Sequence, residues 1–180
     1  MRDLRLYVLM AHYNQWMNDR LYQTCAKLSD DELHLDMKAF FGSIHATLNH
    51  IILSDRVWLG RLANQPFPVH SLSQQLFAEF PELARQRHLT DLAICRTISA
   101  LQPADLDRAV TYRSISQGHE TTRTLDAILL HLFNHQTHHR GQVTTLLAQL
   151  GHDMGVTDLI ACPHAALSDL PGSSCHNESP

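Results

Sequence analysis

The stretch from Leu125 to Leu150 places the clearest constraint on the fold, because its apolar residues recur at helical spacing. Such spacing puts side chains on one face of an α-helix. These residues are Leu125, Ile128, Leu129, Leu132, Val143, Leu146, Leu147 and Leu150. Thr124 is a suitable N-cap residue, and Gly151 stands where a helix commonly ends in a glycine. The stretch therefore predicts a long amphipathic helix.

Four histidines lie in the middle of this helix: His131, His135, His138 and His139. At about 100° per residue, His139 falls near the centre of the apolar stripe and His135 at its margin. His131 and His138 turn toward the polar side. Two imidazoles four positions apart on one helix face can reach a single ion, so H-x-x-x-H is a recurrent half-site for zinc and similar metals. The alternative is a pair of histidines hydrogen-bonded at the core edge, and the spacing alone does not exclude it.

The residues that follow the last histidine, Arg140, Gly141 and Gln142, favour the metal interpretation. A glycine inside a helix costs about 1 kcal/mol relative to alanine. We therefore expect Gly141 to mark the close approach of another helix or of a ligand.

Three further segments, residues 3–28, 39–62 and 72–101, carry apolar residues at helical spacing and predict helices. Pro81 divides the third segment into a short lead-in and a main helix. The main helix is poor in candidate chemistry, and a polar stretch within it is expected to face solvent. The residues of this stretch are Arg85, Arg87, His88 and Thr90.

The connections between these segments also carry signals. Ser29 and Glu32 have the spacing of a capping box, and residues 106–123 weakly predict a β-hairpin or an irregular crossover. Four long helices with such a crossover predict an all-α four-helix bundle, whose core is a natural place for metal ligands. We expect one domain over residues 1–151. The tail, residues 152–180, has little periodicity and is expected to be partly disordered.

The second helical segment contains two more histidines and a carboxylate on or beside its apolar stripe. His45 and His50 both flank the stripe, so spacing does not choose between them as a third ligand. Asp55 falls within the stripe, where a carboxylate needs a hydrogen-bonding or charged partner. Arg56, Arg61 or a ligating histidine are the candidate partners.

Composition excludes several classes of function. A net charge of −4 without a long Lys/Arg cluster gives no electrostatic basis for binding nucleic acid. No apolar run reaches the length of a membrane span, and the first residues do not resemble a signal peptide, so we expect a cytoplasmic protein. The four cysteines are far apart and form no C-x-x-C, which favours reduced thiols.

Two stretches resemble motifs of the DinB/YfiT-like superfamily of metalloenzymes. The first runs from Asn49 to Leu59 (NHIILSDRVWL) and the second from Asn134 to Gln142 (NHQTHHRGQ). Residues 13–18 (YNQWMN) also resemble the opening of many members. The resemblance covers roughly residues 1–151, and H-x-x-x-H-R-G-Q with an upstream Asn-His is fairly specific in combination.

The resemblance implies an up-up-down-down bundle that holds a divalent metal ion with three histidines, one from the second helix and two from the last. Matched position by position, these are His50, His135 and His139. His50 occupies the Asn-His position of the family, and His45 does not. Six further residues are expected to support the ligands or to line a cleft beside them. They are Asp55, Trp58, His131, His138, Arg140 and Gln142.

Three nitrogen ligands leave an open coordination position, which is the arrangement of catalytic sites. Characterised members of the superfamily include thiol S-transferases and a thiol-dependent maleylpyruvate isomerase. The resemblance therefore implies a small-molecule substrate and activation of a low-molecular-weight thiol, and it implies a homodimer. We expect zinc or nickel as the ion, with iron as an alternative. Two other functions stay open: a metal-dependent hydrolase, and a non-catalytic metal-binding or stress-associated bundle.

Overall fold

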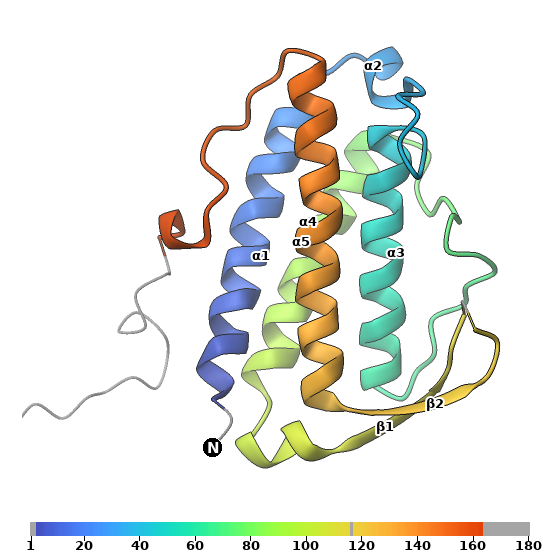
Figure 1. The fold of residues 1–180 in the computed structure, drawn as a ribbon, viewed down its shortest axis with the longest axis vertical. Coiled ribbons are helices and arrows are strands. Elements are labelled where there is room, and N and C mark those ends of the chain that lie inside the picture. The colour runs from blue at the N-terminus through green and yellow to red at the C-terminus, as the bar shows by residue number, and fades with distance from the viewer. Residues whose placement is uncertain (1–2, 116, 164–180) are drawn as a thin grey trace, which may run out of the picture.

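Four long helices lie side by side, and a two-stranded hairpin joins the last two of them at one end (Figure 1). The computed structural model describes residues 3–115 and 117–163. The long helices are α1 (Leu4–Cys25), α3 (Ile44–Leu62), α4 (Phe80–Ser99) and α5 (Leu125–Gln149). The shorter elements are α2 (Asp30–His34), the 3-10 turns η1 (Pro103–Asp107) and η2 (Leu159–Ala161), and the antiparallel strands β1 (Ala109–Arg113) and β2 (Glu120–Thr124). The predicted all-α four-helix bundle with a hairpin before the last helix is confirmed.

The directions of the helices differ from the expected order. Tyr7, near the start of α1, hydrogen-bonds with Asp126 at the start of α5, so these two helices run the same way. On α3, His50 lies beside His139 late in α5 and Trp58 lies beside His131 early in α5, so α3 runs the opposite way. The order is therefore up-down-down-up rather than up-up-down-down. The reason is that residues 63–79 lead the chain back to the end where α3 began, so that α4 runs parallel to α3 (Figure 1).

Local capping decides where the helices begin. Ser43 caps α3 by accepting a hydrogen bond from the backbone N–H of Ala46 at 3.1 Å, and Gly42 before it has a φ of 81°. The prediction that this helix starts at residue 39 is therefore wrong, and Phe40, which lies before the helix, is 84% exposed. The capping box of α2, between Ser29 and Glu32, is confirmed.

Two predictions for the later helices have different outcomes. The lead-in before Pro81 is not helical, because α4 begins at Phe80 with Pro81 in its first turn. Gly151 does end α5 with a left-handed φ of 82°. At Gly141, by contrast, an added Cβ would meet nothing within 4 Å, so this glycine marks no close approach of another helix.

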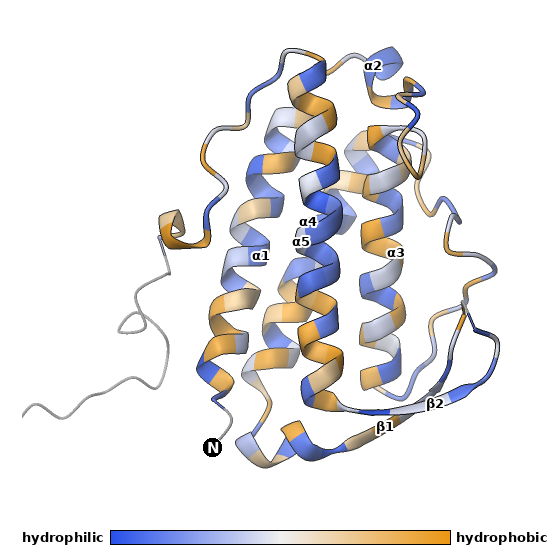
Figure 2. Cartoon of the chain, in the orientation of Figure 1, coloured by the Kyte–Doolittle hydropathy of each residue, from blue (hydrophilic) through white to orange (hydrophobic). Residues whose placement is uncertain are grey.

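The core divides into two apolar clusters with a polar layer between them. One cluster contains Leu21, Leu48 and Leu147, and the other contains Ile94 and Leu129. Figure 2 shows the same division along α5, whose central turns are hydrophilic between two more apolar ends. The centre of the bundle is thus the place where polar side chains from different helices meet.

The described part of the tail, residues 152–163, packs against α1. The Tyr13 hydroxyl donates a hydrogen bond to the carbonyl of Thr157 at 2.7 Å, and Met154 and Cys162 are buried. The rest of the tail, expected to be partly disordered, lies outside the described residues. Within the described chain, no helix is long and apolar enough to cross a membrane.

Candidate metal centre

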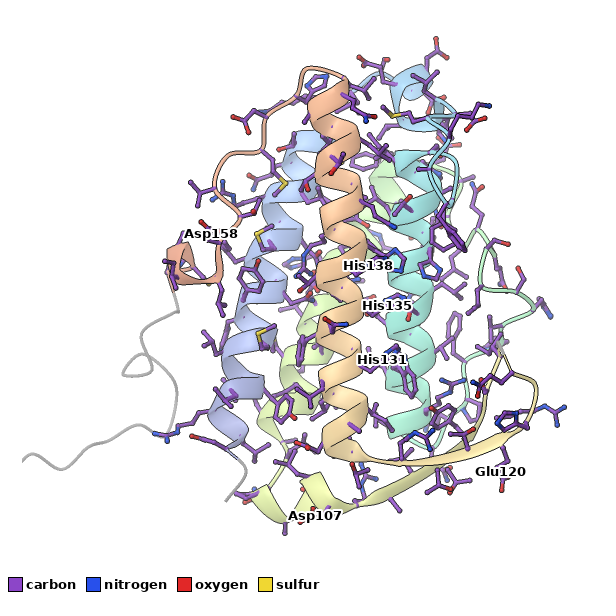
Figure 3. The ribbon with its side chains drawn as sticks, viewed as in Figure 1. Asp107, Glu120, His131, His135, His138 and Asp158 are labelled. Carbon is purple, nitrogen blue, oxygen red and sulfur yellow. The ribbon has the colours of Figure 1, made fainter. Side chains whose placement is uncertain are left out.

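Three histidines meet where the second and last long helices face each other. Each of His50 on α3 and His135 and His139 on α5 offers a ring nitrogen, and the three nitrogens all lie within 4.8 Å of one another. The Nε2 atoms of His50 and His135 are 3.1 Å apart. Figure 3 shows His131, His135 and His138 following one another along α5, next to α3. The i, i+4 pair on α5 thus lies opposite a single histidine on α3.

The second ring nitrogens orient two of these imidazoles. Nδ1 of His50 lies 2.8 Å from the carbonyl oxygen of Leu72, and Nδ1 of His139 lies 2.8 Å from Oε1 of Gln142. Both oxygens only accept, so each Nδ1 carries the proton and each Nε2 keeps a lone pair that could bind an ion. Nδ1 of His135 is buried, and the described residues offer it no hydrogen-bonding partner.

Burial keeps all three imidazoles neutral at pH 7. Desolvation lowers the pKa of His50 to about 4, and desolvation together with the neighbouring histidines lowers the pKa of His135 to about 3. Desolvation also lowers the pKa of His139. Neutral imidazole is the form that binds a metal, so these residues fit a divalent cation.

These pKa shifts predict that acid destabilises the metal-free protein. Between pH 6.5 and about 4 the histidines of the unfolded chain are protonated, whereas buried His50 and half-buried His135 are not. The unfolded state then binds more protons, so the free energy of unfolding falls as the pH falls through this window. The free energy of unfolding, measured with urea, should fall less between pH 7 and pH 5 in His135→Gln than in wild type. The exposed-site variant His119→Gln serves as the control, and equal losses in wild type and His135→Gln would contradict the prediction.

Asn49, the residue before His50, positions the backbone carbonyl that orients the His50 ring. Asn49 is buried, and its Oδ1 accepts hydrogen bonds from the backbone N–H groups of Leu76 and Phe77 at 2.9 and 3.0 Å. Its amide donates back to the carbonyl of Phe77 at 3.1 Å. Asn49 thereby fixes the segment after α3 against the helix, and the same segment brings the Leu72 carbonyl to His50.

Aromatic rings and a cleft surround the histidines. The ring of Phe41 stacks on His50 with a centroid distance of 4.0 Å. On the hairpin side, His131 lies 5.6 Å from His135 and 5.3 Å from Trp58, again between ring centroids. A cavity of about 340 Å³ is lined by both His131 and Trp58. The histidine cluster therefore lies beside a space that can admit a small molecule.

The expected supporting residues divide into two groups. Trp58 and His131 line the cleft. Oε1 of Gln142 accepts a hydrogen bond from Nδ1 of His139, which is the contact expected of a residue that orients a metal ligand. His138 lies on the exposed side of α5, where its ring is 4.8 Å from that of His139 and its Nε2 is 3.3 Å from the Gln142 amide.

Asp55 and Arg140 do not line the cleft, so of the two expected roles only support of the ligands remains a prediction for them. Arg140 is 2% exposed and donates hydrogen bonds to Asn14 and Gln136 inside the bundle. Asp55 is 1% exposed and is paired with Arg87 on α4, not with Arg56, Arg61 or a ligating histidine. Both residues belong to the polar layer of the core.

Arg87 is the centre of this layer and was missed in the sequence. It was expected to face solvent, yet it is 2% exposed and forms ion pairs with Asp55 and Asp91. Thr90, from the same polar stretch, is also buried. A signal was present, because Arg87 and Asp91 continue the helical spacing of buried Leu83. Charged residues on an apolar stripe indicate a buried ion pair.

The polar layer also holds the site in place. Gln136, the residue after His135, donates a hydrogen bond to Asp55, so α3, α4 and α5 are joined directly behind the metal-facing side. His45, the other candidate third ligand, lies elsewhere: it is buried with its ring centroid 4.3 Å from that of His34.

Three comparisons with known proteins agree on the relatives of this chain. The model of the DinB family matches residues 1–173. Protein DinB of Bacillus subtilis (strain 168) is 30% identical over 154 residues, which cover 83% of this chain and 88% of that protein. The crystal structure of a DinB-like protein from Bacillus cereus ATCC 10987 matches the fold with a TM-score of 0.58 at 19% identity, covering 78% of this chain and 90% of that one. The chain therefore belongs to the DinB family.

Proposed function

We propose that this protein binds one divalent metal ion through His50, His135 and His139 and uses it to activate a small thiol. The observation that carries the proposal is the meeting of three neutral ring nitrogens within 4.8 Å, two of them with their tautomers set by hydrogen bonds. Three imidazoles suit zinc or nickel, with iron as the alternative. They leave a coordination position for an exogenous ligand.

A bound ion would lower the pKa of a thiol and so supply the thiolate, which is the nucleophile. In the transfer reaction, the sulfur of RSH forms a bond to an electrophilic carbon of R′X, the C–X bond breaks, and the proton leaves with X as HX. In the isomerisation alternative, the thiol adds to a double bond and is later eliminated unchanged. Reduced thiols persist in the cytoplasm, which is where we place this activity.

The lining of the cleft favours thiol chemistry over hydrolysis. The described residues that line it include no Asp or Glu that could act as the base for a metal-bound water. A metal-bound thiol needs no such base. The protein's own described thiols do not serve, because Cys25 and Cys162 are buried elsewhere and Cys95 lies on α4. None of the described cysteines supplies the thiol, and we propose that it comes from outside the protein.

Titration of the cobalt-substituted protein with small thiols should produce an intense sulfur-to-metal charge-transfer band. The band should be lost in His135→Ala and kept in His138→Ala, the matched control from the exposed side of α5. The same thiols should accelerate the loss of an electrophile such as an alkyl halide above the buffer rate. If no thiol changes the metal spectrum and no such loss is seen, the thiol proposal fails and a non-catalytic metal-binding bundle replaces it.

We also propose that the protein forms a homodimer through the face shared by α1 and α5. Leu6 and Leu130 are 57% and 59% exposed there and border an apolar groove of about 260 Å³. Exposed apolar side chains around such a groove favour association with a second copy. Light scattering at tens of micromolar should give the mass of a dimer. Leu130→Glu should give a monomer and the exposed-site control Leu35→Glu a dimer, and a monomeric wild type would refute this proposal.

A further inference from the structure

The cleft beside the histidines continues toward the hairpin. The cavity of about 340 Å³ that reaches His131 adjoins a second one of about 440 Å³, which extends along β1 and the segment after α3. Five residues line both: Val57, Arg61, Tyr112, Ser114 and Ile115. The two cavities therefore form one elongated pocket that runs from His131, whose ring centroid is 5.6 Å from that of His135, to the hairpin.

Arg61 lies at the junction of the two cavities. Its guanidinium carbon is 4.5 Å from the ring centroid of Trp58 and 4.3 Å from that of Tyr112, and Nη2 donates to the carbonyl of Arg113 at 3.0 Å. The side chain is half-buried, and this burial lowers its pKa. The rings and the carbonyl hold the guanidinium in one position without using all of its donors.

Arg61 has no acidic partner among the residues that the structure describes. No Asp or Glu lies within ion-pairing distance of it, and no carboxylate contributes to the shift of its pKa. Arg56, the other half-buried arginine of α3 that lies over an aromatic ring, differs in this respect. Arg56 lies over Phe77, donates to Gln86 and is influenced by Glu82. A partly desolvated cation that faces a cavity without a counter-charge is suited to an anionic ligand.

The position of Arg61 relative to the histidines sets the shape of that ligand. Arg61 lies eleven positions after His50 on α3, which corresponds to roughly 16 Å along the helix axis. Trp58, Val57 and Ile115 give the cavity that reaches His131 an aromatic and apolar lining. The ligand is therefore elongated, with a charged group at a distance from its reacting end.

We infer that Arg61 binds the carboxylate of the small molecule that reacts at the three histidines, so that the substrates of this site are elongated carboxylic acids. The inference rests on the proposed function for the reacting end. A carboxylate matches one guanidinium in both charge and planar geometry. A phosphate dianion would leave a second charge uncompensated in the pocket, because the other arginines that line it, Arg113 and Arg123, are exposed. The carboxylate belongs either to the thiol or to the electrophile.

The test compares straight-chain ω-mercapto carboxylic acids with ω-mercapto alcohols of the same length. In one arm, the charge-transfer band of the cobalt protein gives the affinity for each probe. We expect acids of intermediate length to bind about ten- to a hundredfold more tightly than the alcohols, as for a charged hydrogen bond. Arg61→Gln should abolish this preference, and the matched variant Arg56→Gln should retain it. A second series, with chloroalkanoic acids against chloroalcohols and a simple thiol, shows whether the carboxylate resides on the electrophile.

A metal-independent arm separates the failure of this inference from the failure of the proposed function. Ligand-observed NMR on metal-free protein should show the same preference for acids over alcohols and the same loss in Arg61→Gln. If no thiol produces a band but the NMR preference holds, the metal chemistry is wrong and the carboxylate site stands. If acids and alcohols bind equally in both arms, the inference is overturned. A preference for acids that survives in Arg61→Gln also overturns it, because a group other than Arg61 then binds the carboxylate.

Discussion

Replacing Arg87 by methionine should lower the free energy of unfolding by about 3 to 5 kcal/mol, the usual cost of breaking a buried ion pair from one side. Arg87 lies between Asp55 and Asp91, and all three side chains are at most 2% exposed. Without the guanidinium, two carboxylates would remain buried next to each other. Urea unfolding at pH 7 measures the difference.

The matched control is Arg85→Met, two positions earlier on the same helix. Arg85 pairs with Glu82 at 2.7 Å, but both side chains are largely exposed, at 59% and 43%. Exposed ion pairs of this kind contribute about 0 to 1 kcal/mol. An Arg87→Met protein that loses no more stability than Arg85→Met would show that the polar layer does not hold the bundle together.

Addition of the metal should in turn stabilise the folded protein. A ligand that binds only the native state raises the free energy of unfolding by about 2.7 kcal/mol at a hundredfold excess over its dissociation constant. Zinc or nickel should therefore raise the unfolding midpoint of wild type and of His138→Ala, and should leave His139→Ala unchanged. The reason is that His139 contributes a buried neutral nitrogen to the cluster, whereas His138 lies on the exposed side of α5. An equal rise in His139→Ala would place the ion elsewhere.

Periodicity in the sequence predicted those features that depend on one segment at a time. The stripe from Leu125 to Leu150 predicted α5, its Thr124 cap and the side on which His135 and His139 lie, and all three agree with the structure. The capping box of α2 was equally local. In each of these cases, the residues that decide the structure are close together in the chain.

Features that depend on contacts between distant segments were harder to predict from the sequence. Asp55 was known to need a partner, but the sequence does not show that Arg87 of α4 faces it, because the direction of α4 depends on the path of residues 63–79. The same uncertainty about path led to the wrong order of helix directions. Arg140 was expected to support the ligands or to line the cleft, and the sequence did not show that it points into the bundle toward Asn14. The choice of His50 over His45 rested on family resemblance, and the geometry of the cluster agrees with it.

The central claim is that one divalent metal ion binds through the three histidines. Elemental analysis of protein purified without a histidine tag, after loading with zinc or nickel and removal of free metal, tests this most directly. The account predicts one ion per chain in wild type and in His138→Ala, and a loss of stoichiometric metal in each of His50→Ala, His135→Ala and His139→Ala. Full occupancy in any of these three variants, while the protein remains folded, would contradict it.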